Sequence, residues 1–250
     1  MLVFGGTLAA CGGDEEPRAE PTPQASSTTP AQVDPAAALW LTFDESSVDI
    51  EGETIYRDAA GSTREGRVVT ARGGEVTEVD GADGAGGAVA FPPPCDGGAC
   101  PRALIEVGDA PALDPGEEPF SFGVSVWLAP DETTTGSNIV QKGRFGTEGG
   151  QWKLQVDDLE GTPSCVVRSG ATMLKVHSDV SIADSAWHRV VCSRDADGIG
   201  IDVDGVVERT EGATGEVSSE YPIRIGSPGV HPTDDQFHGR VDDVFLLVGE

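Results

Sequence analysis

The chain has 250 residues, of which 38% are hydrophobic, so it is long enough to form one sizeable core. This length excludes a peptide hormone or a small disulfide knot. The 43 Asp and Glu residues outnumber the 16 Lys and Arg residues, which gives a net charge of 16 − 43 = −27. Such a charge repels a phosphate backbone, so we expect no nucleic-acid partner.

The N-terminal run of apolar and small residues, 2–10, is about half as long as the roughly 20 residues that span a bilayer. It is followed by Cys11, and the sequence LAACGG resembles the lipobox of bacterial lipoproteins, in which the cysteine becomes the lipidated N-terminus. We therefore expect residues 1–11 to be the end of a signal peptide and Cys11 to be a lipid anchor. A frayed apolar N-terminus with an incidental cysteine is the alternative.

Residues 12–38 contain many Pro, Ala, Thr and Glu residues and almost no large apolar side chain. Such a segment cannot bury enough apolar surface to offset the cost of ordering it, so we expect an extended tether. A lipid and a tether together would hold a folded domain, residues 39–250, away from a membrane. The expected location is the bacterial cell envelope or the extracellular space.

The four cysteines after Cys11 are an even number and allow three pairings in an oxidising compartment. Proximity favours Cys95 with Cys100, because they bracket the turn-forming loop DGGA. That choice leaves Cys165 and Cys192 to join two strands. A metal site is the alternative, but the close ligand pairs of a zinc knuckle are missing.

From residue 39 onward the hydrophobic pattern alternates with period two and is interrupted by turn residues, which indicates an all-β fold. In 120–128, for example, Phe, Val and Leu fall on one face and Ser and Gly on the other. DADG and DG predict tight turns between three successive strands near 187–209. We expect further strands at 39–43, 87–91, 102–107, 138–142, 151–157, 164–168, 222–226 and 240–248.

The order of these strands and their motifs suggests a family. A strand ending in Trp127 is followed by NIVQKG, GGQWKLQV, WHRVV, VDG, IRIG and FHGRVDDV. This series resembles laminin G-like domains of the concanavalin A-like jelly-roll superfamily. The resemblance implies two curved antiparallel sheets packed face to face, and a module that binds glycans or proteins, often with calcium at the rim. The superfamily also contains glycoside hydrolases and lyases.

Catalytic carboxylates are the first group to consider on such a fold. On a strand, Asp158 and Glu160 would share a face with Cα atoms about 6.7 Å apart. However, Gly161 follows at once and the Glu-x-Asp-x-x-Glu pattern of the hydrolase relatives is absent, so we expect a solvated acidic turn. The sequence also has no Gly-x-Ser-x-Gly nucleophile elbow. A loop contains His231 and His238 with two aspartates between them, and we expect this loop to be solvated rather than to hold a metal ion. We expect no enzymatic activity.

Calcium is the expected cofactor. Asp242 has the period of Val244, Leu246 and Val248, so it is predicted to point inward, where an unpaired carboxylate is costly. The resemblance implies that the first and last strands lie together, which makes a Ca²⁺ ion shared by Asp58 and Asp242 the prediction, with Asp44 or Asp243 as further ligands. The alternatives are hydrogen bonds from the backbone or an arginine, and an opposite register of the last strand.

Aromatic faces that stack on sugar rings are candidates for ligand binding. Trp127 falls on the small-residue face of its strand, with Gly123 and Ser125, and is the candidate platform unless a crossing loop covers it. Tyr221 is a weaker candidate, as is Phe145, and both lie in connections. Trp152 and Trp187 align with apolar neighbours and are expected in the core.

The sequence therefore predicts an exported, lipid-anchored surface module that binds extracellular carbohydrate or protein. The membrane would be a partner through the lipid anchor only. A glycan-cleaving hydrolase or lyase on the same fold is the first alternative. A purely structural protein of the envelope is the second.

Overall fold

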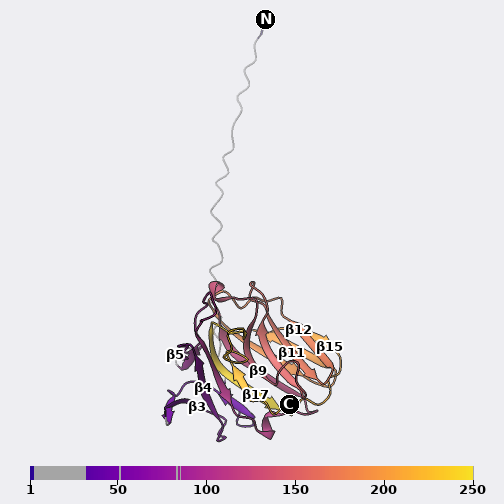
Figure 1. Cartoon of the computed structure of the whole chain (residues 1–250). Helices are drawn as coiled ribbons and strands as arrows, with labels where there is room; N and C mark the ends of the chain where they lie inside the picture. Colours follow the sequence, from indigo (N-terminus) through magenta and orange to yellow (C-terminus); the bar gives the residue numbers. More distant parts are fainter. Residues whose placement is uncertain (3–31, 51, 83, 85, 250) are drawn as a thin grey trace.

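The computed structural model of the chain describes residues 1–2, 32–50, 52–82, 84 and 86–249. Cys11 and most of the predicted signal peptide and tether lie outside these residues. The folded part consists of strands that form two antiparallel sheets, and Figure 1 shows the sheets packed face to face as a sandwich. The predicted all-β sandwich is confirmed. In the described ranges, no helix has the length and apolar character needed to cross a membrane.

The first sheet has nine strands in the order β12-β11-β10-β9-β16-β7-β4-β3-β2. Its outermost strands, β12 and β2, are largely exposed. The strands are β2 Val48–Ile50, β3 Glu53–Arg57, β4 Glu65–Ala71, β7 Arg102–Val107, β9 Ser137–Lys142, β10 Gln151–Val156, β11 Pro163–Ser169, β12 Thr172–His177 and β16 Ile223–Ile225.

The second sheet has eight strands in the order β15-β14-β13-β8-β17-β6-β5, and β1 also pairs with β17. The strands are β1 Leu39–Leu41, β5 Thr77–Asp80, β6 Gly87–Ala90, β8 Phe120–Trp127, β13 Trp187–Arg194, β14 Gly198–Val203, β15 Val206–Glu211 and β17 Arg240–Val248. Two 3-10 turns, η1 Pro111–Leu113 and η2 Pro130–Glu132, flank β8. The strand β8 therefore lies at the centre of this sheet, between β13 and β17.

The core fills the space between the two sheets. Phe120, Phe122, Val124 and Val126 of β8 are at most 1% exposed, so the predicted alternation of this strand is confirmed. The ring of Phe122 contacts that of Trp152 from the other sheet, with centroids 4.4 Å apart. Because each sheet contributes one of these rings, the contact joins the two layers.

Both predicted cysteine pairs lie at disulfide distance. Cys165 and Cys192 have Cα atoms 5.8 Å apart, and both side chains are buried. Cys165 belongs to β11 and Cys192 to β13, so the disulfide joins two strands, as predicted. These strands lie in different sheets, so the disulfide also links the two layers of the sandwich. Cys95 and Cys100, with Cα atoms 5.6 Å apart, close a short loop between β6 and β7.

The strands that the hydrophobic pattern does not predict lie at or near the sheet edges. They are β2 to β5, which precede residue 87, and β12 at the opposite edge of the nine-stranded sheet. Residues such as those of β5, TEVD, bury almost nothing and show no apolar alternation. Their strand conformation comes from pairing with a neighbouring strand, which a single-strand pattern does not record.

The disulfides differ in what they contribute to stability. Replacing both Cys165 and Cys192 by Ala opens a 27-residue separation, for which chain entropy predicts a loss of about 3 kcal/mol in the free energy of unfolding. The matched control, Ala at Cys95 and Cys100, opens a 5-residue separation and is expected to cost about 1–1.5 kcal/mol less than that. Urea unfolding of the two variants measures both values. Equal losses would contradict the assignment of the inter-sheet link as the main covalent brace.

Candidate functional site

The outer face of the eight-stranded sheet carries an unusual group of large side chains. Trp127, at the end of β8, points away from the core as predicted and is half-buried. Trp187 of β13 lies directly opposite it in register. The expectation that Trp187 belongs to the core is wrong, whereas Trp152 is 1% exposed and does lie there. Val190 and Val191 are both apolar, so alternation along β13 does not decide which face Trp187 takes.

Two arginines lie over aromatic rings on the same outer face. The guanidinium carbon of Arg240, which is opposite Trp127 on β17, is 4.1 Å from the centroid of the Trp127 ring. That of Arg189 on β13 is 4.9 Å from the centroid of Phe245. We call these five residues the tryptophan–arginine face. Cation–π contacts of this kind are worth about 0.5–2 kcal/mol each and hold the guanidinium groups in place.

The other candidate aromatic residue lies elsewhere. Tyr221 lines a hollow with Asp114, Ser219 and Glu148. The hydrogen bond from the Ser219 N–H to Asp114 and the bridge between Gly116 and Val217 place it near the start of β8. Trp127 is at the other end of this strand, about 23 Å away at 3.3 Å per residue. Trp127 and Tyr221 therefore do not form one binding site.

Asp58, the first predicted calcium ligand, is already saturated with donors. Its carboxylate accepts hydrogen bonds from the N–H groups of Trp40 (2.9 Å) and Ala60 (3.0 Å) and from the Ser62 hydroxyl. Arg64 lies 3.9 Å away. This set fixes the turn after β3. The alternative predicted for Asp242, hydrogen bonds from the backbone, is found at Asp242 itself, which accepts from the Ala82 and Asp243 N–H groups.

Asp242 lies on the outer face rather than in the core. A β-bulge between Asp242 and Phe245, with Asp243 at φ 50°, shifts the alternation of β17, so Val241 and Val244 both reach the core. The inward orientation predicted from period two is therefore wrong. Asp242 is nevertheless 5% exposed, because the turn after β5 covers it and the Ala82 N–H donates to its carboxylate.

Burial raises the pKa of Asp242 to about 7, and the neighbouring carboxylates of Asp243 and Asp44 act in the same direction. Asp44 faces the same turn, where it accepts a hydrogen bond from the Gly87 N–H. Asp44 and Asp243 thus lie near Asp242, whereas Asp58 lines a hollow together with Asp44 and does not act on the Asp242 carboxylate. Among the described residues, no group of three or more His, Cys, Asp or Glu side chains has the geometry to hold a metal ion.

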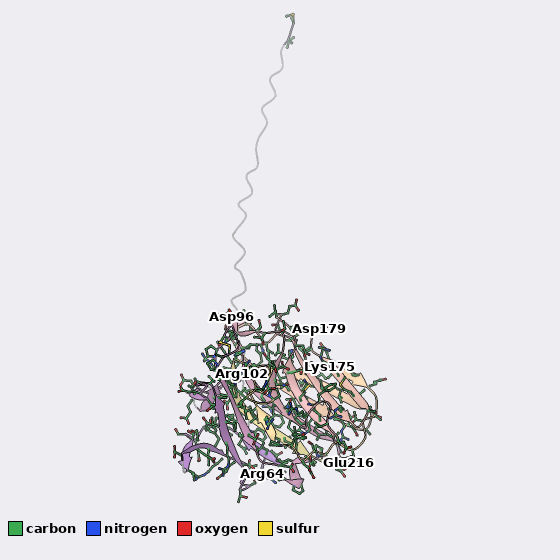
Figure 2. The ribbon with its side chains drawn as sticks, in the orientation of Figure 1. Arg64, Asp96, Arg102, Lys175, Asp179 and Glu216 are labelled. Atoms are coloured by element: carbon green, nitrogen blue, oxygen red, sulfur yellow. A yellow bond between two sulfur atoms is a disulfide. The ribbon has the colours of Figure 1, made fainter. Side chains whose placement is uncertain are left out.

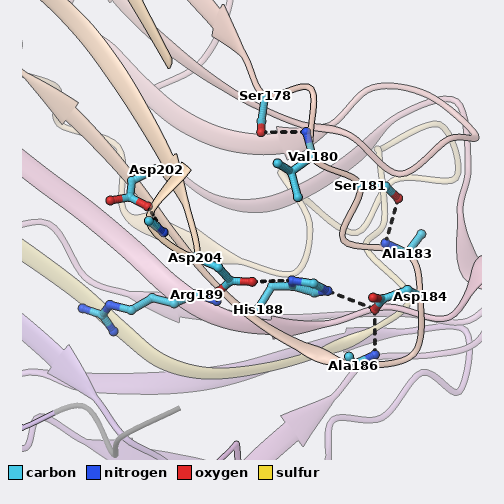
Figure 3. A network of polar contacts seen from close by, with 11 residues as sticks. Ser178, Val180, Ser181, Ala183, Asp184, Ala186, His188, Arg189, Asp202 and Asp204 are labelled. Atoms are coloured by element: carbon cyan, nitrogen blue, oxygen red, sulfur yellow. Dashed lines mark hydrogen bonds and ion pairs between the residues drawn. The ribbon is translucent and has the colours of Figure 1, made fainter. Parts of the chain in front are cut away.

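His188, which lies between Trp187 and Arg189 at the start of β13, bridges two aspartates (Figure 3). The two ring nitrogens of His188 lie 2.7 Å from Asp204 and 2.9 Å from Asp184. Asp204 also accepts the Arg189 N–H, while the Arg189 side chain extends away from this network. The two carboxylates outweigh the effect of burial and raise the pKa of His188, so the imidazolium form ties the loop before β13 to the β14–β15 turn.

The remaining chemical candidates have structural partners. Asp158 accepts hydrogen bonds from the N–H and hydroxyl of Thr162 in the turn after β10, and Glu160 is exposed there. His238 is buried and donates from Nδ1 to the Pro92 carbonyl at 2.6 Å, whereas the exposed His231 contacts Thr233. Phe145 is 75% exposed in the β9–β10 connection.

The residues that sequence reasoning missed are Trp187, Arg189 and Arg240. Trp187 and Arg189 have the spacing i, i+2 on one strand, which is the signal that could have placed them on a common face. Arg240 could not be assigned to Trp127 in this way, because the two belong to strands 113 residues apart in the sequence, a separation given by 240 − 127. Only the register of β8 with β17 brings them together.

A laminin G-type family model, described as the concanavalin A-like lectin/glucanases superfamily, matches residues 105–247. Because the match covers more than half of the chain, the chain belongs to this superfamily. The fold and its jelly-roll relatives agree with that assignment. No curated protein sequence matches the chain.

Several solved structures have the same fold. Domain 4 of AbnA, a GH43 extracellular arabinanase from Geobacillus stearothermophilus solved with arabinotriose, has a TM-score of 0.58 and 17% identity, covering 85% of this chain and 92% of that one. The binding domain of Paraclostridial Mosquitocidal Protein 1 has a TM-score of 0.60 and 12% identity, covering 85% and 48%. The binding domain of botulinum neurotoxin DC in complex with SialylT has a TM-score of 0.55 and 12% identity, covering 85% of this chain and 48% of that one. The chain spans about half the length of these toxin domains.

The raised pKa of His188 predicts a pH-dependent contribution to stability. It is fully present below the unfolded pKa of about 6.5 and is lost as the pH rises through the folded pKa. We expect His188→Gln to lower the free energy of unfolding by about 2 kcal/mol at pH 5.5, with a smaller loss at alkaline pH. Urea unfolding across this range measures the difference, with His231→Gln as an exposed control. A loss that grows with pH would contradict the bridge.

Calcium binding stays a prediction, now centred on Asp44 and Asp242. If the ion binds the native state, 1 mM CaCl₂ should raise the melting temperature by several degrees over chelator, and Asp44→Asn should remove the increase. The control is an equal concentration of MgCl₂, which prefers stricter geometry. Identical melting curves in calcium and in chelator would contradict calcium binding.

Proposed function

We propose that the chain is a non-catalytic module that binds extracellular carbohydrate through the tryptophan–arginine face. The observation that carries this proposal is the pair of half-buried indole rings, Trp127 and Trp187, side by side on an outer sheet face. Flat aromatic faces on a rigid strand suit the apolar faces of sugar rings, and neighbouring arginines supply donors for oxygen atoms.

Membership of a superfamily of lectins and glucanases supports a binding module, as does the arabinotriose complex of the AbnA domain. Several fold neighbours are toxin receptor-binding domains, one of them solved with rat synaptotagmin II, so a surface protein is the other class of partner to test. The absence of catalytic activity is part of the proposal. It is supported by Asp158 and Glu160, which lie in a turn and do not face each other across a cleft.

Export and anchoring through Cys11 belong to the same proposal and rest on the sequence alone. A surface location would bring the module to extracellular glycans, and the tether would give it reach. Fatty-acid labelling of the whole chain, compared with Cys11→Ser, tests the anchor, since an unlabelled wild type would contradict it.

The binding test is a glycan and polysaccharide array probed with the purified chain, with calcium and then with chelator. We expect one sugar class to bind, and we expect Trp127→Ala and Trp187→Ala each to weaken that binding about tenfold, since stacking contributes about 1 kcal/mol or more per ring. The control is Met173→Ala, a 52% exposed apolar residue on the nine-stranded sheet.

If the wild type binds no glycan on the array and retains a protein in a pull-down from envelope extracts, the partner is a protein rather than a glycan. Cleavage of any polysaccharide on the panel would contradict the non-catalytic assignment. Unchanged binding by both tryptophan variants would move the site away from this face.

A further inference from the structure

The two arginines of the tryptophan–arginine face differ from the other sheltered arginines of the described chain. Seven arginines are partly or fully buried. Arg189 and Arg240 alone among them make no side-chain hydrogen bond to a described residue. The remaining five, Arg64, Arg102, Arg168, Arg194 and Arg224, bond backbone carbonyls or a carboxylate.

This lack of partners is unexpected in a chain with 43 carboxylates. The acidic side chains around the face are committed to other donors, and none of them lies within 4.0 Å of either guanidinium in the described structure. Glu132 accepts from the Ala129 N–H, Asp204 from Arg189 N–H and His188, Asp242 from the Ala82 and Asp243 N–H groups, and Asp243 from the Trp40 indole. Burial raises the pKa of Glu132, and Arg240 acts on this pKa in the opposite direction without forming an ion pair.

The geometry leaves the donors of Arg240 available. Its guanidinium lies over the Trp127 ring, and its N–H groups, which lie in the plane of the guanidinium, donate to no described residue. A guanidinium edge of this kind matches the two oxygens of a carboxylate in a bidentate pair. Hydroxyl groups of a neutral sugar offer no such match.

Arg189 supplies a second, independent indication. It starts on β13 and crosses Gly123 of β8 to reach Phe245 on β17, and a side chain at position 123 would collide with the Phe245 ring at 2.9 Å. Its Nη1 atom is buried with no described acceptor. An unpartnered buried N–H of this type costs about 1–3 kcal/mol, which an incoming acceptor would recover.

We infer that the tryptophan–arginine face takes an acidic glycan, with uronic or sialic acid residues, whose carboxylates accept hydrogen bonds from Arg240 or from Arg189. This inference rests on the proposed glycan-binding function and specifies its ligand class. A sugar ring would lie against the indoles, and a carboxylate would face one of the two guanidinium groups. The rings under these groups lie at Trp127 and opposite Gly123, four residues apart on β8, which is about 13 Å at 3.3 Å per residue. The net charge of −27 opposes an anion at long range, but at 0.15 M salt charges beyond about 8 Å are screened and a direct pair is not.

The test compares sugars that differ in charge. The whole chain is titrated calorimetrically at 0.15 M NaCl with hexagalacturonate and its methyl ester, and with sialyllactose and lactose. We expect at least one acid to bind about tenfold or more tightly than its neutral partner. Arg240→Gln and Arg189→Gln should each weaken binding of the acid more than binding of its neutral partner, and so reduce this preference.

Two controls separate recognition from folding. Arg209→Gln changes an exposed arginine of β15 in the same sheet, paired with Asp195, and should keep the preference. Arg240→Lys keeps the charge but loses the bidentate edge, so it should give an intermediate preference. Melting curves of every variant confirm the native fold.

The outcomes distinguish the inference from the proposed function. If acid and neutral forms bind equally and Trp127→Ala weakens both, the glycan-binding function stands and the acidic ligand is wrong. If folded arginine variants keep the full preference, the acid binds elsewhere and the inference is also wrong. If no probe binds the wild type, the acidic ligand is wrong, and the array decides whether the glycan-binding function stands.

Discussion

The contact between two dry sheet faces is the constraint on which the rest of this structure depends. Phe122 and Trp152 meet across it, and the Cys165–Cys192 disulfide links the layers. The indole N–H of Trp152 is buried without a described acceptor, a cost of about 1–3 kcal/mol that packing of the ring has to exceed. Since one face of each strand is committed to this core, the side chains of the opposite face are free to serve binding.

The predictability of the fold follows the same division. Strands that line the core, such as β8 Phe120–Trp127 and β10 Gln151–Val156, are predictable because burial on one face imposes alternation on the sequence. Edge strands such as β5 are largely exposed on both faces, and their sequences show no apolar alternation. The turn of Asp242 to the outer face also could not be foreseen, because a bulge is set by the neighbouring strand and by the left-handed backbone of Asp243, neither of which alters the composition of the segment.

The candidate site was predictable only one residue at a time. Trp127 was placed on the outer face by its own strand, but Trp187 and Arg240 reach it through registers between strands far apart in the sequence. Tyr221 shows the converse, since an aromatic residue in a connection gives no indication of which end of the sandwich it will occupy. Figure 2 places Glu216, five residues earlier, at the end of the molecule opposite Asp96. Pairing is thus what converts scattered aromatic and basic residues into a surface.

The position of β17 has a consequence for how the chain acquires its structure. It is the last strand, yet it lies in the middle of its sheet, between β8 and β6, and also pairs with β1 at Leu39 and Leu246. Neither the sheet nor the core can close until residues 240–248 are available, so shorter chains leave apolar strand faces and edges uncovered. Contacts between such distant segments give slow folding of high contact order. A domain emerging from a ribosome or a translocation pore would therefore stay incomplete, and open to chaperones, until residues 240–248 are released.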